Sequence, residues 1–290
     1  MSKAEKLPRW IIRSMQVADL AFAAGCTTAE GWTGETLATF EGFYQHDPNG
    51  CFLAELVGRP VGICIATPYG HSGFIGELIV RPEARGRGIG AALLNHAVEY
   101  LRQQDAGTVY LDGVVKAVPL YERNGFRKIC RSLRFSGTLK GESHSDVRAM
   151  RTDDLPAVFA LDRQAFGADR SFLLARRLQR FPELCQVMVE EGKLTSFILG
   201  RRGEGWAAAG PWVIAQEARA PLRLLESLAC QVGEASIGVG ILETNHRAVE
   251  LVRSLGFAVR EHSPWRMALG PSGDLGASPL CFAVGTAATG

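Results

Sequence analysis

Residues 78 to 94 read Leu-Ile-Val-Arg-Pro-Glu-Ala-Arg-Gly-Arg-Gly-Ile-Gly-Ala-Ala-Leu-Leu and carry the most informative pattern in the chain. A short apolar run is followed by a turn with glycines at alternate positions, Gly86, Gly88 and Gly90, and then by a helical pattern. Glycine lacks the Cβ atom that would keep a ligand away from the main chain, so successive N–H groups can approach one anion at the positive end of the helix. The stretch predicts a loop that holds a phosphate or pyrophosphate group.

The charges around these glycines favour the same interpretation. Arg81, Arg85 and Arg87 stand against one acidic residue, Glu83. Positive side chains beside exposed backbone N–H groups attract an anionic ligand. The alternative is a surface turn whose arginines are only solvated.

A dinucleotide-binding loop is a second alternative, because the following strand ends in Asp112, near the position of a ribose-binding acid. Two features count against it. The third glycine of that motif would fall at position 93, which is Leu93. The turn between Val80 and Gly86 is also too long for the tight connection that dinucleotide sites use.

A second motif, residues 111 to 126, reads Leu-Asp-Gly-Val-Val-Lys-Ala-Val-Pro-Leu-Tyr-Glu-Arg-Asn-Gly-Phe. It predicts a short helix that carries Tyr121 and ends in Asn-Gly-Phe. Together with the spacing Arg85-x-x-Gly88-x-Gly90 after a strand, this motif resembles the signature of the GCN5-related N-acetyltransferases, the GNAT superfamily.

The resemblance implies acetyl-CoA as co-substrate and no metal. Tyr121 matches the tyrosine that lies beside the CoA sulfur, which makes it the candidate catalytic acid; a tyrosine of the core is the alternative. Many family members carry asparagine at the position of Val114, so that hydrogen bond is not available here. The residues implied to bind the cofactor are the end of the strand and the loop with the first helical turn: Ile79, Val80, Arg85, Gly86, Arg87, Gly88, Ile89, Gly90 and Ala91.

Three further side chains are candidates for the site. Glu77, three residues before Val80, is the candidate general base, acting through water, and a solvated glutamate at a strand edge is the alternative. Glu30 and Trp32 lie in the loop where acceptors of the superfamily usually enter. They are candidates to bind the amine, with helix capping and core packing as their alternatives. His71 is expected at the surface.

The chain contains the same unit twice. Residues 13–20 have a counterpart in residues 148–155, and both segments open a helix with Asp beside Leu. Residues 121–126 are echoed by 252–257, and 134–135 by 266–267. The offsets of about 130 residues are the size of a domain, so they indicate duplication of a whole domain. Segments 30–32, 73–76, 111–114 and 210–213 look like the two-domain bacterial YitH-type acetyltransferases, which also join two GNAT-like domains.

The order of elements predicts an α/β (α+β) class, with tandem GNAT folds that each have a mixed, mostly antiparallel central sheet flanked by helices. Residues 1–138 are the expected catalytic domain, which binds acetyl-CoA, and residues 147–290 a degenerate GNAT-like domain. In the first repeat we expect helices over 18–26, 35–46, 90–101 and 115–123, and strands over 51–57, 61–66, 74–80, 109–111 and 126–135.

The second repeat keeps the scaffold but lacks the loop. No glycine stands from 211 through 232, so side chains would obstruct a phosphate, and Glu217 would repel it. Val252 takes the tyrosine position. Asn245, seven residues earlier, does match the asparagine that the first repeat lacks. We therefore expect the second repeat to bind no cofactor.

Composition sets outer limits. The chain has 290 residues, 47% hydrophobic and 21% charged, which is typical of a globular protein. A net charge of +2 gives no basic field for nucleic acid. Seven cysteines without a C-x-x-C pair suggest neither a disulfide framework nor a zinc site. With no apolar leader or membrane-length run, we expect a cytoplasmic protein that does not bind membranes.

Two functions fit these observations. One is N-acetyltransferase activity, which moves the acetyl group from acetyl-CoA to a primary amine of a small molecule by direct attack. The other is a non-catalytic acyl-CoA-binding or regulatory protein. Tyr121 favours the first, while the missing asparagine and the weak case for a base keep the second open. The sequence identifies neither the acceptor nor the oligomeric state, so a homo-oligomer stays open too.

Overall fold

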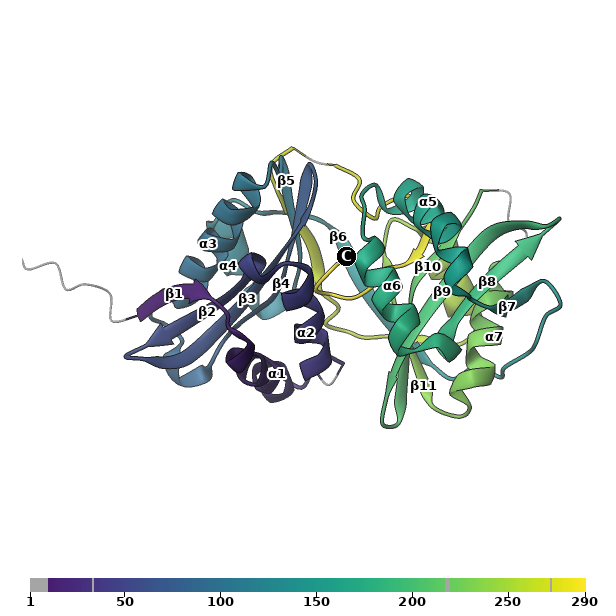
Figure 1. Ribbon diagram of the computed structural model, residues 1–290, viewed down its shortest axis with the longest axis horizontal. Helices are drawn as coiled ribbons and strands as arrows, with labels where there is room; N and C mark the ends of the chain where they lie inside the picture. The colour runs from purple at the N-terminus through teal and green to yellow at the C-terminus, as the bar shows by residue number, and fades with distance from the viewer. Residues whose placement is uncertain (1–9, 33, 217–219, 272) are drawn as a thin grey trace, which may run out of the picture. The chain divides into compact units, whose positions relative to one another are not determined.

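The computed structural model describes residues 10–32, 34–216, 220–271 and 273–290 (Figure 1). The chain divides into two compact units, with Val109 as the last residue of the first and Tyr110 as the first residue of the second. The N-terminal segment 1–9, where we expected no apolar leader, lies outside the described residues. Among the helices described, none is both long enough and apolar enough to cross a bilayer.

The first unit is built on an antiparallel sheet in the order β1-β2-β3-β4. The expected hairpin of β2 and β3 is present, with β3 longer than predicted. The edge strand β1 was not predicted, because its five residues alternate little between apolar and polar. The elements are β1 (Trp10–Ser14), α1 (Leu20–Ala29), α2 (Leu37–His46), β2 (Cys51–Leu56), β3 (Arg59–Tyr69), β4 (Ser72–Val80) and α3 (Ile89–Gln103).

A β-bulge interrupts the pairing of β4 with β3. Ile65 lies opposite Gly76 and Ile63 lies opposite Ile79, so two residues of β4 face one residue of β3. Glu77 is one of the two and has a φ of 50°, in the left-handed region. A bulge bends the strand and turns its end away from the regular ladder. The segment that leads into the glycine loop therefore leaves the sheet at this point.

The second unit contains one long mixed sheet in the order β5-β13-β6-β11-β10-β9-β8-β7. In addition, β12 pairs with β6 and β14 pairs with β10. The elements are β5 (Thr108–Gly113), α4 (Val118–Arg123), β6 (Arg127–Gly137), β7 (Val147–Ala149), α5 (Leu155–Phe166), α6 (Ser171–Arg180), β8 (Cys185–Glu190), β9 (Lys193–Gly203), β10 (Trp206–Ile214), α7 (Leu222–Val232), β11 (Ser236–Leu242), α8 (His246–Ser254), β12 (Ala258–Val259), β13 (Trp265–Leu269) and β14 (Cys281–Ala283).

The helices of this unit cover both faces of its sheet (Figure 1). Neighbouring residues of a strand point to opposite faces, so Val187 packs with α5 and α6 while Met188 packs with α7 and α8. Phe197 and Ile198 on β9 divide in the same way. The alternation produces two apolar cores, one on each side of the sheet.

Strand β6 is shared between the two sequence repeats. Its first half pairs with β13, from the end of the second repeat, and its second half pairs with β11. Strand β13 in turn lies between β5 and β6, both from the first repeat. This exchange of strands explains why the compact units do not coincide with the repeats. The boundaries at 138 and 147 stay a prediction about the repeats.

The duplication is visible in matching side-chain pairs. Arg13 forms an ion pair with Asp19 at 2.7 Å, and Arg148 forms one with Asp154 at the same distance. These residues are 135 positions apart in sequence, and each aspartate directly precedes a helix, α1 or α5. The strand β10 also repeats the bulge of β4, because its register shifts between Ala209 and Trp212.

Candidate active site

The glycine loop has the backbone that the sequence predicts. Gly88 is the N-cap of α3 with a φ of 81°, and Gly86 has a φ of 73°. A Cβ atom placed on either glycine would meet nothing within 4 Å, so the space beside the main chain is open. The first hydrogen bond of the helix runs from the Ala92 N–H to the Gly88 carbonyl at 3.0 Å. The N–H groups of the first turn therefore point out of the helix end, where an anion is stabilised.

The arginines around the loop have different surroundings. Arg85 donates from Nε to the Val80 carbonyl at 2.8 Å and forms an ion pair with Glu30. Arg81 lies 3.5 Å from the carboxylate of Glu83. Arg87 is exposed and enters none of the ion pairs found within the described ranges. Its charge is the one most available to a ligand at the loop.

The end of β4 is held by β3 and by the Arg85 side chain. Val80 lies opposite Gly62, and Ile79 is buried. The Val80 carbonyl accepts the Arg85 hydrogen bond, and the N–H of the next residue, Arg81, donates to the Val61 carbonyl at 2.8 Å. The strand end and the loop are thus fixed to each other by main-chain and side-chain bonds.

Glu77 is buried, with 6% of its surface exposed. The alternative of a solvated strand-edge glutamate is wrong, because the residue is buried at the bulge of β4. Burial raises the pKa of the neighbouring Cys64 thiol well above its usual range, and the charge of Glu77 raises it further. The carboxylate therefore lies close enough to Cys64 to affect its thiol, at the left-handed backbone position of β4.

Glu30 and Trp32 follow directly after α1. Glu30 is the C-cap residue, and its carboxylate, 13% exposed, pairs with Arg85. The structure thus joins a predicted acceptor residue to a predicted cofactor residue. Trp32 is partly buried, and its main-chain N–H donates to the Thr27 carbonyl at 2.9 Å. His71 is exposed in a hairpin turn, as expected.

Tyr121 belongs to the second unit and lies on α4. It is 7% exposed, and its ring packs edge-on against Phe126 with 6.1 Å between centroids. A Cβ atom at Gly113 would lie 2.8 Å from the same ring, so glycine is needed there. Val114 is the N-cap of the short helix that precedes α4. Its apolar side chain supplies no polar contact at the asparagine position.

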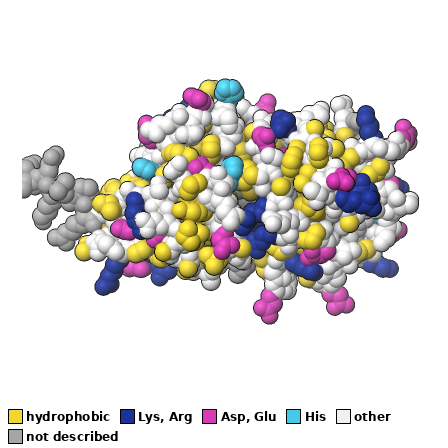
Figure 2. Space-filling view, viewed as in Figure 1, with side chains coloured by type: hydrophobic (Ala, Val, Ile, Leu, Met, Phe, Trp, Pro, Cys, Tyr) yellow, Lys and Arg dark blue, Asp and Glu magenta, His cyan; other side chains and the backbone are white. Residues whose placement is uncertain are grey.

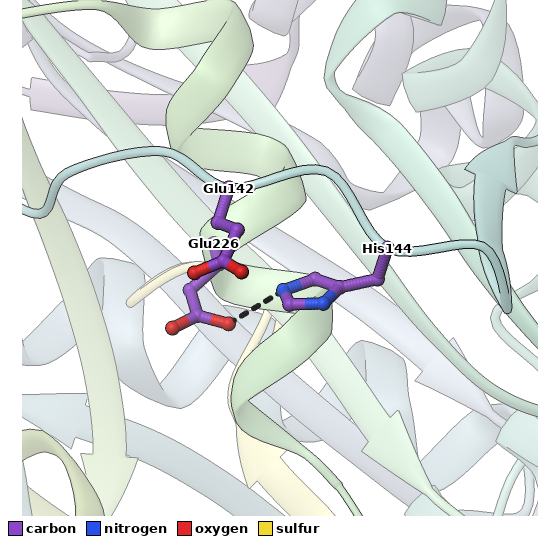
Figure 3. A group of neighbouring side chains, drawn as sticks. All are labelled: Glu142, His144 and Glu226. Atoms are coloured by element: carbon purple, nitrogen blue, oxygen red, sulfur yellow. Dashed lines mark hydrogen bonds and ion pairs between the residues drawn. The ribbon is translucent and has the colours of Figure 1, made fainter.

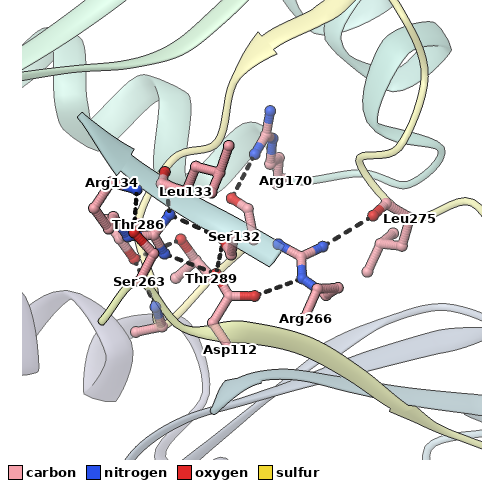
Figure 4. A network of polar contacts seen from close by, with 12 residues as sticks. Asp112, Ser132, Leu133, Arg134, Arg170, Ser263, Arg266, Leu275, Thr286 and Thr289 are labelled. Carbon is pink, nitrogen blue, oxygen red and sulfur yellow. Dashed lines mark hydrogen bonds and ion pairs between the residues drawn. The ribbon is translucent and has the colours of Figure 1, made fainter. Parts of the chain in front are cut away.

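Asp112 has a structural role that excludes ribose binding (Figure 4). Its carboxylate is fully buried, 2.6 Å from Arg266 and 2.8 Å from Arg134, and it accepts a hydrogen bond from Ser132 at 2.7 Å. Burial alone would raise the pKa of this carboxyl, but the two arginines outweigh burial and lower it. Asp112, the residue that would bind ribose in a dinucleotide site, is therefore already bound to side chains of the protein itself.

The second repeat differs from the first at the same point of the fold. Helix α7 begins after Pro221 instead of a left-handed glycine. Glu217, which we expected to repel phosphate, lies outside the described residues. Val252 is fully buried in the core, and Asn245 is the N-cap of α8. The side chain of Asn245 accepts from the Ala248 N–H and donates to two main-chain carbonyls.

One group of polar side chains was missed by sequence reasoning. Glu142 and His144, from the linker of residues 139–146 between the two repeats, and Glu226 from α7 bring their polar atoms within 4.8 Å of one another (Figure 3). His144 Nε2 lies 2.7 Å from the Glu226 carboxylate. The bond fastens the linker to α7. No local spacing connects residues so far apart in sequence, so no signal could have found it.

All seven cysteines lie within the described part of the chain. All seven carry free thiols, and each is buried except Cys230. On the face drawn in Figure 2, basic and acidic side chains are interspersed among the described residues. This mixing is consistent with the net charge of +2.

Two family models match the chain, one for each repeat. The Acetyltransferase (GNAT) family model matches residues 16–126, which include the glycine loop and Tyr121. A second model, described as Acetyltransferase (GNAT) domain, matches residues 158–276. The two matches together cover most of the chain and agree with the duplication.

Curated relatives match over one part of the chain. An uncharacterized N-acetyltransferase of Methanocaldococcus jannaschii is 34% identical over 99 residues, which are 31% of this chain and 44% of that protein. A mycothiol acetyltransferase of Acidimicrobium ferrooxidans is 38% identical over 103 residues, 33% of each chain. A glucosamine 6-phosphate N-acetyltransferase of Trypanosoma brucei brucei is 39% identical over 93 residues, 31% of this chain and 61% of that protein. The chain spans less than two thirds of each of them.

Solved structures match over the whole chain. A Pyrococcus horikoshii protein assigned to the acetyltransferases has a TM-score of 0.83 at 24% identity, covering 100% of this chain and 99% of that one. A tandem GNAT protein from the clavulanic acid biosynthesis pathway has a TM-score of 0.61 at 16% identity, covering 91% and 100%. These likenesses show the fold of both repeats in one chain. Together with the family matches, they identify the chain as a two-domain acetyltransferase of the GNAT family.

Proposed function

We propose that this acyltransferase moves the acetyl group of acetyl-CoA to a primary amine of a small molecule. The observation that carries the proposal is the left-handed Gly88 at the start of the 15-residue helix α3, with open space where a side chain would stand. The outward N–H groups of the first turn and the charge of Arg87 suit a pyrophosphate. Arg85 holds the loop against the end of β4.

Direct attack requires two proton transfers, for which the chain has two candidates. The lone pair of the neutral amine attacks the thioester carbon, the C–S bond breaks, and the CoA thiolate takes a proton from Tyr121. A phenol of pKa ~10 is well matched to a thiol of pKa ~8.5. The proton released by the amine passes through water to Glu77, and Tyr121 regains its proton from solvent. A main-chain N–H near Ile79 or Val80 would stabilise the oxyanion.

The binding of the acceptor is assigned to Glu30 and Trp32. A carboxylate attracts an ammonium group before it loses its proton, and the indole ring supplies an apolar surface. Because Glu30 already pairs with Arg85, its charge also connects the acceptor loop to the cofactor loop. Two relatives carry the names of small-molecule enzymes, a mycothiol acetyltransferase and a glucosamine 6-phosphate N-acetyltransferase, which supports a small acceptor.

The roles of the two repeats follow from their loops. Residues 1–138 would supply the acetyl-CoA site, while residues 147–290 would bind no cofactor. The second repeat would then shape or cover the acceptor pocket. This assignment rests on Gly88 in one repeat and the absence of glycine from 211 through 232 in the other.

A panel of amines tests the proposal. Acetyl-CoA is mixed with amino sugars, amino-thiol conjugates, polyamines, amino acids and a short peptide, and released CoA is detected with a thiol reagent. The assay uses a Cys230→Ser chain, because the exposed Cys230 thiol would itself react with the reagent. Release with a small amine supports the proposal. Tight binding of acetyl-CoA without release on any amine favours the non-catalytic acyl-CoA-binding alternative, and release on the peptide alone moves the acceptor class to protein N-termini.

A further inference from the structure

The strands β10 and β11 of the second repeat separate beyond the bulge. They pair in parallel from Trp206 to Ala209, opposite residues 236–239, and their register ends there. The C-terminal strand β14 then takes the place of β11 beside β10: Trp212 lies opposite Ala283 and Val213 opposite Cys281. On its other side this C-terminal segment is bonded to β11. The Val284 N–H donates to the Gly240 carbonyl at 2.8 Å.

Asn245 holds this strand from the side of α8. Its amide nitrogen donates to the Cys281 carbonyl at 2.9 Å and to the Pro279 carbonyl at 3.1 Å. The residue is 4% exposed, so these bonds form out of water, where an unmet donor is costly. Its oxygen meanwhile accepts from the Ala248 N–H and caps the helix. One side chain thus binds the strand and begins the helix.

Most residues of the C-terminal segment 281–290 are buried. Phe282 is fully buried, with its ring 5.3 Å from that of Trp212. At the end of the segment, the Gly290 carbonyl accepts from the buried Arg170, whose guanidinium is paired with Asp162. Thr289 is also buried. Residues 279–290, hereafter the strap, are therefore anchored at both ends.

The strap occupies the position in the second repeat that corresponds to the proposed cofactor site of the first repeat. Each bulged strand shifts register once against its hairpin partner, β3 for β4 and β9 for β10, and the first paired residues after the shift are Ile79 in β4 and Trp212 in β10. Val80 and Val213 follow as counterparts. Ile79 and Val80 are among the residues proposed to bind acetyl-CoA, and we take their main chain to pair with the pantetheine arm, which is an extended chain with two amide groups. A β-strand offers the same chemistry, an extended backbone with amides at regular spacing.

We propose that the strap is a built-in ligand that occupies the acyl-CoA groove of the second repeat. The groove between β10 and β11 takes an extended, amide-bearing chain, and Asn245 recognises its carbonyls. The proposal rests on the proposed function in one respect, since it takes the groove of the first repeat to hold pantetheine. As a consequence, the chain binds one acyl-CoA. The strap alone would close the second repeat to the cofactor, even if its loop carried the glycines that it lacks.

The test cuts the strap from the folded chain. A protease site is inserted between Gly273 and Asp274, which are exposed ahead of the strap. After folding and cleavage, residues 274–290 form a separate peptide. We expect the peptide to stay with the protein through gel filtration. Immediate loss of the peptide from a protein that stays folded would overturn the proposal.

Two variants examine the recognition by Asn245. Asn245→Asp keeps the oxygen that caps α8 but removes the amide donors, so we expect release of the peptide to be about 100-fold faster. Glu250→Ala, on the exposed face of the same helix, should leave the release rate unchanged. Equal rates for both variants would show that Asn245 does not bind the strap.

The last arm asks whether the groove is a ligand site. In a cut chain that also carries Gly88→Val, a fluorescent peptide of residues 278–290 is allowed to replace the cut segment. We expect millimolar pantetheine to displace it, and an uncut Gly88→Val chain to bind no acetyl-CoA. If neither pantetheine nor unlabelled peptide displaces the fluorescent peptide, the result contradicts the proposal. If the wild-type chain fails to bind acetyl-CoA, the proposed function fails, but the peptide measurements still decide whether the strap occupies a groove.

Discussion

The ends of β4 and β10 are the same structure with different surroundings. Both strands carry a bulge at the same point, with Glu77 at a φ of 50° in one and Gly210 at a φ of 146° in the other. Beyond the bulge, β4 leads to an open glycine loop, while β10 is paired with β14. A duplicated fold can therefore keep its strand geometry in both copies, yet leave the ligand groove open in one and fill it with its own chain in the other.

The largest expected effect is on acetyl-CoA binding by the first repeat, whose glycine loop is open. Gly88→Val places a branched side chain where the ligand would lie and should abolish acetyl-CoA binding and turnover. At 100 times the Kd, ligand binding stabilises a protein by ~2.7 kcal/mol, so the thermal shift on adding acetyl-CoA should disappear. Gly70→Val is the matched control, because Gly70 also has a positive φ, 66°, and open space but lies in the β3–β4 turn. An equal loss of binding in both variants would point to backbone strain alone.

The next effect separates Tyr121 from its counterpart Val252. Tyr121→Phe removes one hydroxyl and should lower kcat by roughly 10² to 10⁴, with little change in the Kd for acetyl-CoA. Tyr100→Phe is the control: its hydroxyl donates to Asp47 at 2.5 Å, and its loss should reduce stability by about 1 kcal/mol without lowering kcat. Unchanged turnover in Tyr121→Phe would assign the proton donor to another group.

A third prediction concerns the carboxylate of Asp112, which binds one arginine from each repeat. Arg134 and Arg266 are counterparts in the repeats, and both bind the buried Asp112. Asp112→Asn leaves the buried guanidinium of Arg266 and the partly buried one of Arg134 without a counter-charge and should cost about 3–5 kcal/mol of unfolding free energy, measured by denaturant titration. Glu122→Gln breaks the exposed pair with Lys128 and should cost less than about 1 kcal/mol. Similar losses in the two variants would contradict a central role for Asp112.

The smallest effect compares the matching pairs of the repeats. A hydrogen bond from Arg13 lowers the pKa of Asp19, and one from Arg148 lowers that of Asp154. Each pair therefore contributes stability above the unfolded pKa of 3.8 that is lost as pH falls through the lower folded pKa. We expect Asp19→Asn and Asp154→Asn each to cost about 1 kcal/mol at pH 7, since the arginines are partly exposed.

Both variants should lose less stability than wild type between pH 4 and pH 2, because each lacks one titrating carboxylate. Parallel denaturant titrations across that range measure the difference. A large effect in one variant and none in the other would show that the two pairs are not equivalent.

Much of the fold could be predicted because its signals are local. The alternate glycines, the helix after them and the hairpin of β2 and β3 each depend on neighbouring residues, and the structure confirms them. The duplication was visible because Arg13 with Asp19 and Arg148 with Asp154 repeat a local motif. The buried position of Glu77 was not predicted, because a bulge depends on the pairing of two strands and not on one of them.

The remaining features depend on contacts between distant segments. The exchange of β6 and β13 between repeats changes no periodicity within either strand. The bonds from Asn245 to the strap span 34 and 36 residues, so the asparagine could be matched to a family position but its partner could not be named. The tie between His144 and Glu226 likewise joins residues 82 positions apart.

The stoichiometry of acetyl-CoA binding tests the central claim most directly. Calorimetric titration of the full chain should give one acetyl-CoA per chain, with no second, weaker phase. The same titration of the Gly88→Val chain should give no binding, because the first groove is blocked and the strap fills the second. Two bound molecules per chain, or one that persists in Gly88→Val, would contradict the account, since the cofactor would then be entering the second repeat.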